Sequence, residues 1–464
     1  MNSKTMTAIL AAAGMALPSA SFAATPEVTG VTMTQATSSR LVTIEYTLAD
    51  APAVVTLDVQ TNANTSAAAD DPGWASIGGV AVCNAEGDVW KQVATGARTI
   101  TWRPDLSWPD HKIEEGGARA VVTAWALDNT PDYMVVDLTA TGGAGTQRYY
   151  PGVDFLPGAQ IGQTGAITNN PIYKTTTIVM RKIMAKGVTW TMGSTTLETQ
   201  RTAERESSHQ VTLTNNYYIG VYEMTQTQWG LIQTSRTTPS YFTNLADRAM
   251  RPVEFVSYYD IRNSANNSAN TANDWPANPN SNSFLGKLYT KTGILFDLPS
   301  EAQWEFAARA GNGDTKWGDG STVLNEKLDA NLNLLGRYER NGGRVQDGTS
   351  YVDPAQSCGA MNGTAIVGSY IPNSWGLYDM HGNVAEWCLD WYTADITTLD
   401  GKVNIDPAIP ANTVSGVAGT QRLLRGGRWD LDASGCRSAY RGWTPPDNRW
   451  RNIGFRVVCT AGLQ

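Results

Sequence analysis

The sequence predicts an α+β protein in which an all-β region precedes a larger region of short helices and much irregular structure. The first supporting observation is a series of β-prone segments within residues 28–140, separated by Gly, Asp and Pro. The second is a set of three helix-start signals after residue 171, in a region that otherwise shows little periodicity. The third is the abundance of 44 Gly, 16 Trp and 18 Tyr, which favours aromatic cores connected by tight turns.

Residues 1–23 have the pattern of a secretory signal peptide. Lys4 supplies a positive start, Met6 to Leu17 form an apolar run, and Ala23 ends a small-residue cleavage site. The apolar run is shorter than the ~20 residues that a membrane helix needs, and no later stretch approaches that length. We therefore expect a secreted or periplasmic protein without a transmembrane segment, in a compartment where disulfides persist.

Composition argues against several functional classes. Charged residues make up 17% of the chain, below the roughly 25% usual for globular domains. The net charge is −8 and there is no long basic run, so we expect no nucleic-acid partner and no anionic-membrane partner. The three histidines, His111, His209 and His381, do not stand at metal-ligand spacing, which argues against a multi-histidine iron or zinc site.

The interval 25–140 is predicted to form a β-sandwich of immunoglobulin or fibronectin type. Acids and nucleophiles do not cluster in it, so we interpret this domain as a spacer or an interaction module. Its single cysteine, Cys83, is predicted to be a buried small apolar residue. The segments that alternate apolar and polar side chains, or are continuously β-prone, are residues 43–48, 53–61, 97–104 and 118–127.

The interval 141–170 is predicted to be a linker, because it is rich in Gly, Thr and Asn and lacks periodicity. The second domain is then predicted to span residues 171–464. Within it, residues 264–283 form a polar low-complexity stretch that is typical of a surface loop.

Capping residues indicate helices in the second domain. Thr225 with Gln228, and Ser300 with Gln303, each fit a capping box. A third helix is predicted to start at Ser257. Because these helices are short and the rest of the domain shows little periodicity, we expect added rigidity from a bound metal ion or from disulfides.

The helix that follows Ser300 is predicted to pack one side into the core. Trp304, Ala307 and Ala308 fall on one face at helical spacing. Gly311 is the predicted stop signal of this helix.

Five segments of the second domain form a set. They are YYIGVYEMTQTQW (217–229), RPVEFVSYYD (251–260), LPSEAQWEFAARAG (298–311), GLYDMHGNVAEWCLDWY (376–392) and RLLRGGRWDLDASGCRSAYRGWTPPDNRWRNIGFRVV (422–458). Together and in this order they resemble the sulfatase-modifying-factor, or formylglycine-generating-enzyme, family over roughly residues 176–459. The resemblance implies a fold related to C-type lectins, with short helices around a small twisted sheet, and it leaves the first domain outside.

In the family, the segment that matches residues 376–392 holds a structural calcium ion. The resemblance therefore implies Asp379 and Glu386 as carboxylate ligands, with Gly382 and Val384 as carbonyl ligands. The chemistry agrees, because calcium takes about six to eight oxygens in flexible geometry and suits carboxylates mixed with turn carbonyls.

A structural alternative stays open for the same two acids. In it, Asp379 caps a turn and Glu386 pairs with an arginine such as Arg425 or Arg456. Glu386 stands beside Trp387 in the sequence, and a carboxylate buried there requires either a cation or such a partner.

The resemblance also implies a second calcium site, made by the Asn331 side chain and the Leu332 carbonyl. The stretch that matches its downstream acid, residues 357–365, contains no carboxylate. The alternative interpretation of Asn331 is an ordinary loop amide.

The resemblance bears on catalysis as well. Active members convert a sulfatase cysteine to formylglycine with Cu(I) and dioxygen, and two cysteine thiolates hold the metal. Cu(I) is soft and takes two thiolates, whereas this chain has only Cys436 in the matching segment and Leu431 at the partner position. Arg428 and Ala385 also depart from the residues of active members. We predict that the copper oxidase centre is missing, and Cys436 is a catalytic candidate only if activity survives.

Disulfides are expected in an exported protein. The four cysteines of the second domain, Cys358, Cys388, Cys436 and Cys459, allow three connectivities. We favour Cys388–Cys436, which joins two of the matching segments. His381 is interpreted as a surface turn residue rather than an acid–base group, because it has no visible carboxylate or nucleophile partner at short range.

Two functional hypotheses follow, and the sequence leaves open whether the protein is an enzyme. The first is a family member without the oxidase centre, in which a calcium-stabilised domain binds a protein, peptide or glycan. The alternative is an active formylglycine-generating oxidase with a displaced copper site. Trp429, Trp443 and Trp450 either line a cleft for such a ligand or pack in the core.

Overall fold

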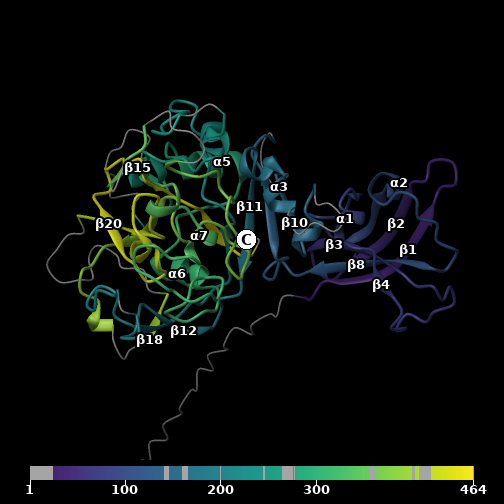
Figure 1. Ribbon diagram of the computed structural model, residues 1–464. Coiled ribbons are helices and arrows are strands. Elements are labelled where there is room, and N and C mark those ends of the chain that lie inside the picture. Colours follow the sequence, from purple (N-terminus) through teal and green to yellow (C-terminus); the bar gives the residue numbers. More distant parts are fainter. Residues whose placement is uncertain are drawn as a thin grey trace, which may run out of the picture.

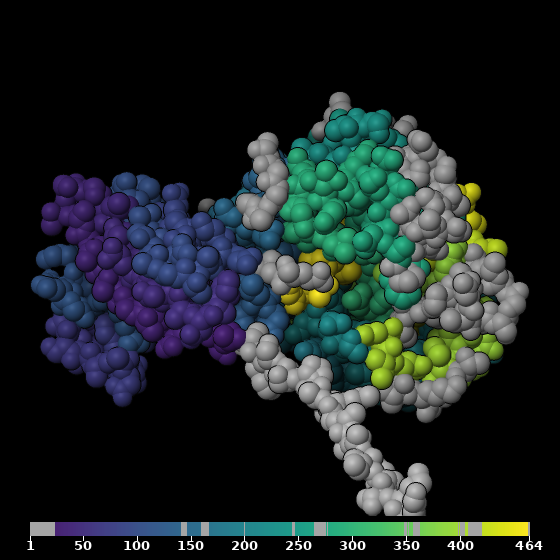
Figure 2. All heavy atoms as spheres, turned by 180° about the vertical axis from the view of Figure 1, so that it is seen from behind, coloured from purple at the N-terminus to yellow at the C-terminus, as the bar shows by residue number. Residues whose placement is uncertain are grey.

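The computed structural model divides into two lobes (Figure 1). A smaller all-β lobe contains the first residues described, and a larger lobe with short helices contains most of the others. Figure 2 shows the same two lobes from behind. The structure describes residues 24–140, 146–158, 166–198, 200–243, 246–263, 275, 277–347, 350–355, 362–399, 403–406 and 420–462.

Several predictions lie outside these ranges, wholly or in part. The signal peptide at residues 1–23 and Cys358 are wholly outside them. Parts of the predicted linker and most of the low-complexity stretch at 264–283 are outside as well.

The smaller lobe is built from two antiparallel sheets. In one of its strands, the alternating residues Ile44, Tyr46 and Leu48 are buried, as expected for a strand with one covered face. The four predicted β segments coincide with β2, β3, β7 and β8. The first sheet has the order β1 (Glu27–Gln35), β2 (Val42–Ala49), β7 (Gly96–Trp102), β5 (Glu86–Gly87), and the second has β4 (Ala75–Ser76), β3 (Ala53–Thr61), β6 (Gln92–Val93), with β8 (Ala118–Trp125) also paired to β3; the helices are α1 (Gly79–Val82) and α2 (Pro104–Ser107).

A five-stranded antiparallel sheet lies where the two lobes meet. Figure 1 shows β10 and β11 between the lobes, with the C-terminus beside them. The strand order is β10 (Gln147–Tyr150), β9 (Tyr133–Asp137), β11 (Thr177–Ile183), β14 (Tyr217–Gly220) and β22 (Val458–Thr460). Strand β9 thus lies inside the interval predicted for the first domain, and β10 inside the predicted linker. Both join the sheet of the second domain.

Alternation along β9 explains its place between the lobes. Val135 packs into the core cluster of the smaller lobe, whereas Met134 and Val136 pack into the main cluster of the larger lobe. Successive side chains of a strand point to opposite faces, so one strand serves both cores. The high Gly and Thr content of residues 141–170 concealed the short neighbouring strand that contains the buried residues Tyr149 and Tyr150.

Both predicted capping boxes are confirmed. Thr225 caps α4 with Gln228, and Ser300 caps α6 with Gln303; in each box both reciprocal hydrogen bonds are present. An unpredicted helix, α5, is capped by Ser283, the last residue of the low-complexity stretch. The helices of this lobe are α3 (Ala166–Asn169), α4 (Gln226–Ile232), α5 (Phe284–Thr292), α6 (Glu301–Arg309) and α7 (Leu332–Leu335).

Helix α6 packs as its apolar face predicts, since Trp304, Ala307 and Ala308 are fully buried. The helix ends at Arg309, before a left-handed Ala310 with φ of 49°, and Gly311 follows with φ of 85°. The helix predicted at Ser257 is a single π-helical turn; Ser257 and Asp260 exchange side-chain to backbone hydrogen bonds at its start. The short turns are η1 (Val153–Phe155), η2 (Pro171–Lys174), η3 (Arg248–Met250), η4 (Tyr259–Asn263), η6 (Glu339–Asn341), η7 (Thr397–Leu399) and η8 (Ala433–Cys436).

The rest of the larger lobe consists of small sheets connected by irregular segments, so the lobe is mixed α+β with little helix. No helix in the described part of the chain has both the length and the apolar composition needed to cross a membrane. The small sheets have the orders β12 (Thr189–Met192), β13 (His209–Thr212), β18 (Val403–Ile405); β15 (Val345–Asp347), β16 (Ser350–Val352); and β20 (Gly442–Thr444), β19 (Arg422–Arg425), β17 (Ala385–Trp391), β21 (Ile453–Gly454).

The position of β9 leads to a prediction about stability. Val136→Ala should destabilise the protein by about 2 kcal/mol, because it opens a cavity in the core of the larger lobe. Urea unfolding followed by tryptophan fluorescence measures the change. Val31→Ala is the matched control, because Val31 is 37% exposed on β1; equal midpoints for the two variants would contradict the assignment of β9 to this core.

Candidate functional site

Residues 376–384 form a tight loop that leads into β17 (Ala385–Trp391). The backbone of the loop is left-handed at Asp379, with φ of 56°, and at Gly382, with φ of 101°. A Cβ at Gly382 would lie 2.2 Å from the Arg337 carbonyl oxygen, so the close approach of the two backbones requires glycine. The loop places Glu386 in β17, where it is fully buried.

Glu386 is held by Arg456. The Arg456 Nε lies 2.9 Å from Glu386 Oε1 and 2.7 Å from Oε2, and Nη2 lies 2.6 Å from Oε1. The indole N–H of Trp304 donates to Glu386 Oε2 at 2.8 Å. Both carboxylate oxygens therefore have donors. Of the two arginines considered as partners, Arg456 makes this pair, and Arg425 pairs with Glu305 instead.

Two more carboxylates lie near this ion pair. Asp379 Oδ2 accepts a hydrogen bond from the Gly368 backbone N–H at 2.7 Å. Asp379 Oδ1 is buried and has no hydrogen-bond partner among the residues described. Glu223 accepts from the Asn383 side chain at 2.6 Å and from the Val384 N–H at 3.1 Å.

These three buried carboxylates face two cations, Arg456 and Lys174. Burial raises the pKa of Asp379 to about 6, and the charges of both cations oppose the rise. Burial, followed by the charges of Asp379 and Glu386, raises the pKa of Glu223 well above its ordinary value. When all three acids are ionised the cluster has an excess of buried negative charge, which a further cation would stabilise.

The predicted calcium ligands fit a hard cation only in part. Asp379 fits, because its buried oxygen without a partner is what a cation would satisfy. Glu386 fits less well, because both of its oxygens already accept from Arg456 and Trp304. Over the described ranges, no group of three or more His, Cys, Asp or Glu side chains is arranged to hold a metal ion.

The residues of the second predicted calcium site already have partners in their own loop. The Asn331 amide donates to the Thr322 carbonyl at 2.7 Å, and the Leu332 carbonyl accepts from the Gly336 N–H at 3.2 Å. The Asn331 contact is made by Nδ2, so it does not occupy Oδ1, the atom that would bind calcium. The neighbouring carboxylate of Asp329 accepts backbone N–H groups from Leu324, Asn325, Asn331 and Leu332.

Cys436 is a buried free thiol, and burial raises its pKa to about 12. It packs with Trp317 and Leu335 in one core cluster. Cys388 is also free and buried, but it belongs to another cluster, together with Trp304. The predicted Cys388–Cys436 disulfide is therefore not formed in the structure, because the two thiols lie in separate cores.

The remaining described cysteines are free as well. Cys459 is buried in the main cluster of the larger lobe. Cys83 is half-buried rather than buried, and burial still raises the pKa of its thiol.

Three residues differ from those expected in active family members: Leu431, Arg428 and Ala385. Each of them is held by its neighbours in this chain. Leu431 packs against Gly435, where an added Cβ would lie 2.7 Å from Leu431 Cδ1. The Arg428 Nε donates to Asp430 Oδ1 at 2.7 Å. Ala385 is buried at the start of β17. The position expected to supply a second thiolate is thus occupied by an apolar packing residue.

His381 is buried, which corrects its interpretation as a surface turn residue. Its Nε2 lies 3.0 Å from the Gly318 N–H and must accept, so Nδ1 carries the proton and donates to the Cys436 carbonyl at 3.0 Å. Burial lowers the pKa of His381 to about 4. The imidazole is therefore a neutral connection between two loops.

A groove of about 670 Å³ lies beside the Arg428 segment, and we call it the aromatic groove. Two of the three tryptophans considered earlier, Trp443 and Trp450, line it, whereas Trp429 is fully buried in the core. Trp450 is 52% exposed, so a large aromatic surface is accessible to a ligand. The groove is lined by Tyr241, Phe255, Asp353, Leu424, Arg428, Asp430, Trp443, Thr444, Arg449, Trp450, Arg451, Asn452 and Ile453.

The arginines of the aromatic groove are paired with carboxylates. Arg449 binds Asp260 through two hydrogen bonds of 2.7 Å. Arg451 pairs with Asp353, just as Arg428 pairs with Asp430. Pairing holds the guanidinium groups in place while their remaining N–H groups stay available for a polar ligand.

Sequence reasoning missed Glu223, although it stands within the segment 217–229. The signal was a single acid in an otherwise apolar and aromatic run, in which a buried carboxylate needs partners. Its hydrogen bonds come from residues 160 and 161 positions away, Asn383 and Val384. Such a separation cannot be inferred from local pattern.

The ion pair at the site predicts a strong effect of one substitution. Glu386→Gln should destabilise the protein by about 3–5 kcal/mol, because it leaves the fully buried Arg456 guanidinium without its counter-charge. Chemical unfolding of wild type and variant measures the loss. Glu114→Gln, which breaks an exposed pair with Lys112, is the control and should leave the midpoint unchanged. Similar midpoints for both variants would contradict a central role for this pair.

Comparison with known proteins gives matches to the larger lobe. Residues 174–461 match the sulfatase-modifying factor enzyme 1-like domain. A formylglycine-generating enzyme of Thermomonospora curvata is 36% identical over 167 residues, 35% of this chain and 48% of that protein. The chaperone protein LppX of Paenibacillus barcinonensis is 29% identical over 266 residues, 54% of this chain and 82% of that protein. In the solved structure of Treponema denticola variable protein 1, the similarity has a TM-score of 0.42 at 27% identity and covers 61% of this chain and 95% of that one.

The chain spans about half the length of the Thermomonospora enzyme that it matches. The domain match, in contrast, covers more than half of this chain. It includes the loop before β17, the aromatic groove, and the residues Glu223 and Arg456. It agrees with the resemblance carried by the five segments. The chain therefore belongs to the sulfatase-modifying-factor, or formylglycine-generating-enzyme-like, family.

Proposed function

We propose that this protein is an exported family member without the copper oxidase centre, in which a calcium-stabilised domain binds a protein, peptide or glycan. The observation that carries the proposal is the state of Cys436, a single buried thiol in an apolar cluster. The signal-peptide pattern of residues 1–23 supports export.

Copper chemistry requires a pair of thiolates that Cys436 does not supply. With a pKa of about 12, its thiol stays protonated at neutral pH, and the thiolate is the form that binds soft metals. Leu431 occupies the position of the partner. Of the other described cysteines of this domain, Cys388 and Cys459 lie in different core clusters.

The aromatic groove supports a binding function. Exposed aromatic side chains next to oriented arginines are typical of surfaces that recognise peptides and other polar ligands. Trp450 and Phe255 are exposed at this groove, and Arg449 and Arg451 flank them. The similarity to a protein named as a chaperone is consistent with binding rather than oxidation.

The alternative function is that of an active formylglycine-generating oxidase. The 36% identity to a protein of that name favours it. In this alternative Cys436 is the catalytic thiol and copper is the cofactor, and the metal site is displaced from its position in the family.

The proposal also assigns a role to the smaller lobe. Its two antiparallel sheets support an immunoglobulin- or fibronectin-like sandwich, which acts as a spacer or interaction module beside a domain related to C-type lectins.

Calcium would supply positive charge next to an excess of buried carboxylates. Asp379 would hold it, with the Gly382 and Val384 carbonyls and with whatever coordination the Arg456-bound Glu386 retains. The loop at Asn331 and Leu332 would hold a second ion under the same proposal.

Calcium removal should lower the melting temperature of the wild-type protein, and Asp379→Gly should remove this sensitivity. Glycine tolerates the left-handed backbone at this position, so the variant loses the carboxylate without added strain. Melting with and without a chelator, measured for both proteins, gives the result. Glu114→Gln should respond to the chelator as wild type does. A wild type that melts identically in both conditions would contradict the calcium site.

The function itself is tested by two readouts on the copper-treated full chain. Incubation with a cysteine-containing sulfatase-motif peptide should leave the peptide mass unchanged, because no thiolate pair holds copper. Screening against displayed peptides and immobilised glycans should give binding that Trp450→Ala weakens at least about tenfold. A peptide mass loss that matches aldehyde formation would establish the oxidase instead.

Tyr289→Ala is the matched control for the binding readout. Tyr289 is 51% exposed on α5 and does not line the aromatic groove, so its loss removes a comparable aromatic surface elsewhere. Equal weakening by both variants would count against the groove as the binding site.

A further inference from the structure

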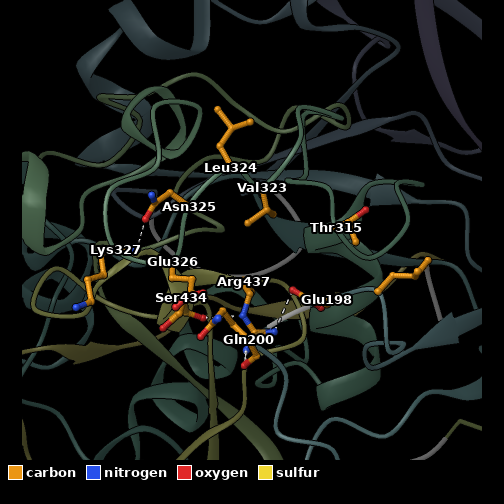
Figure 3. A pocket seen from close by; sticks show the side chains of 11 residues that line it. Glu198, Gln200, Thr315, Val323, Leu324, Asn325, Glu326, Lys327, Ser434 and Arg437 are labelled. Carbon is orange, nitrogen blue, oxygen red and sulfur yellow. Dashed lines mark hydrogen bonds and ion pairs between the residues drawn. The ribbon is translucent and has the colours of Figure 1, made fainter.

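A second cavity, of about 540 Å³, lies where three separate segments of the larger lobe meet (Figure 3). We call it the Glu198 cavity; its main lining residues are Leu197, Glu198, Leu324, Glu326, Lys327 and Arg437. It shares no lining residue with the aromatic groove. Its volume falls within the range of about 300–1,000 Å³ typical of ligand sites.

Two residues that line the cavity, Glu198 and Arg437, belong to a buried cluster that Glu206 completes. The Arg437 Nη1 lies 3.0 Å from Glu198 Oε1 and 2.8 Å from Glu206 Oε2, and Nη2 lies 3.0 Å from Glu206 Oε1. Burial alone would lower the pKa of Arg437, but the hydrogen bond and charge of Glu206 and the charge of Glu198 raise it. The cluster therefore sets one guanidinium against two carboxyl groups.

One oxygen of this cluster lacks a donor. Glu198 is 7% exposed, and its Oε2 is buried without a hydrogen-bond partner in the described part of the chain. A buried carboxylate oxygen without a donor is costly. Glu198 lines the cavity, so a turn of its carboxylate would bring this covered oxygen to a ligand that carries an N–H donor, and the new bond would remove the cost.

The walls of the cavity expose apolar surface. Leu197 is 74% exposed and Leu324 is 61% exposed, and both line the cavity. Single exposed leucines are common, but these two come from separate segments and both line the cavity that Glu198 also lines. A complementary ligand therefore has an apolar stem and a cationic head. Lys327 and Glu326 also line the cavity, and their opposite charges offset each other.

We propose that the Glu198 cavity binds an ammonium group on an aliphatic stem, as presented by a lysine side chain of a peptide. Glu198 Oε1 is already taken by Arg437, so one oxygen remains for the ligand. A guanidinium gains most from two parallel bonds to both oxygens of a carboxylate, whereas an ammonium is a compact point donor that needs only one. Ser434 Oγ donates to Asp432, so it offers the ligand an acceptor.

The test uses the full chain and small probes. Nα-acetyl-lysine amide should bind saturably, and the norleucine analogue, which keeps the stem without the charge, should bind at least about tenfold more weakly. The arginine analogue should also bind more weakly than the lysine probe. Glu198→Gln should weaken lysine binding about tenfold, because it removes the counter-charge. Ligand-observed NMR titration measures all of these.

Glu204→Gln is the matched control, because Glu204 is an exposed carboxylate nearby that does not line the cavity. It should leave lysine binding unchanged. Glu198→Gln is expected to fold, because Arg437 retains both bonds to Glu206, and a melting curve checks this. Absence of saturable lysine binding to wild type, equal binding of norleucine, stronger binding of arginine, or undiminished binding by the folded Glu198→Gln variant would each overturn the proposal.

Discussion

The buried pair of Glu386 and Arg456 is the contact on which the larger lobe depends. Arg456 also donates to the carbonyls of Gly220, at the end of β14, and Tyr378, in the loop before β17. Glu386 in turn accepts from Trp304 on α6. Two charges removed from water are stable only when all their hydrogen-bonding groups have partners. Since these partners come from β14, the loop before β17 and α6, the pair fixes these three segments relative to one another.

The same kind of interaction recurs wherever regular structure is sparse. Arg425 pairs with Glu305, and Arg441 forms two hydrogen bonds to Glu301 at the start of α6. A guanidinium can bind carboxylate and carbonyl oxygens at once, which suits a lobe of short elements and long loops. This frame does not depend on Cys436, whose thiol contributes only packing. Under the proposed function, the fold accommodates Leu431 where active relatives are expected to have a second thiol, whereas copper binding would need that thiol.

Two surfaces of different character result from this frame. The aromatic groove presents ring faces and arginines that are already paired, whereas the Glu198 cavity presents a buried acid oxygen that lacks a donor. We propose the first as a surface for a peptide or glycan and the second as a site for one cationic group. The Glu198 cavity is made of residues distant in the sequence, which explains why motifs did not identify Glu198. A motif consists of residues that are close in the sequence, whereas a cavity is lined by residues that are close in space.

The sequence by itself determined the family, the strands β2, β3, β7 and β8 of the smaller lobe, and the capped helices at Thr225 and Ser300. The strands and helices rest on patterns within a few consecutive residues, and the family rests on five such short segments taken in order. Only the tertiary structure decided that β9 and β10 belong to the sheet of the larger lobe, that Glu386 pairs with Arg456, and that Cys388 and Cys436 lie in separate cores. These outcomes depend on long-range burial, because a charge or thiol in a core acquires partners that the surrounding sequence does not contain.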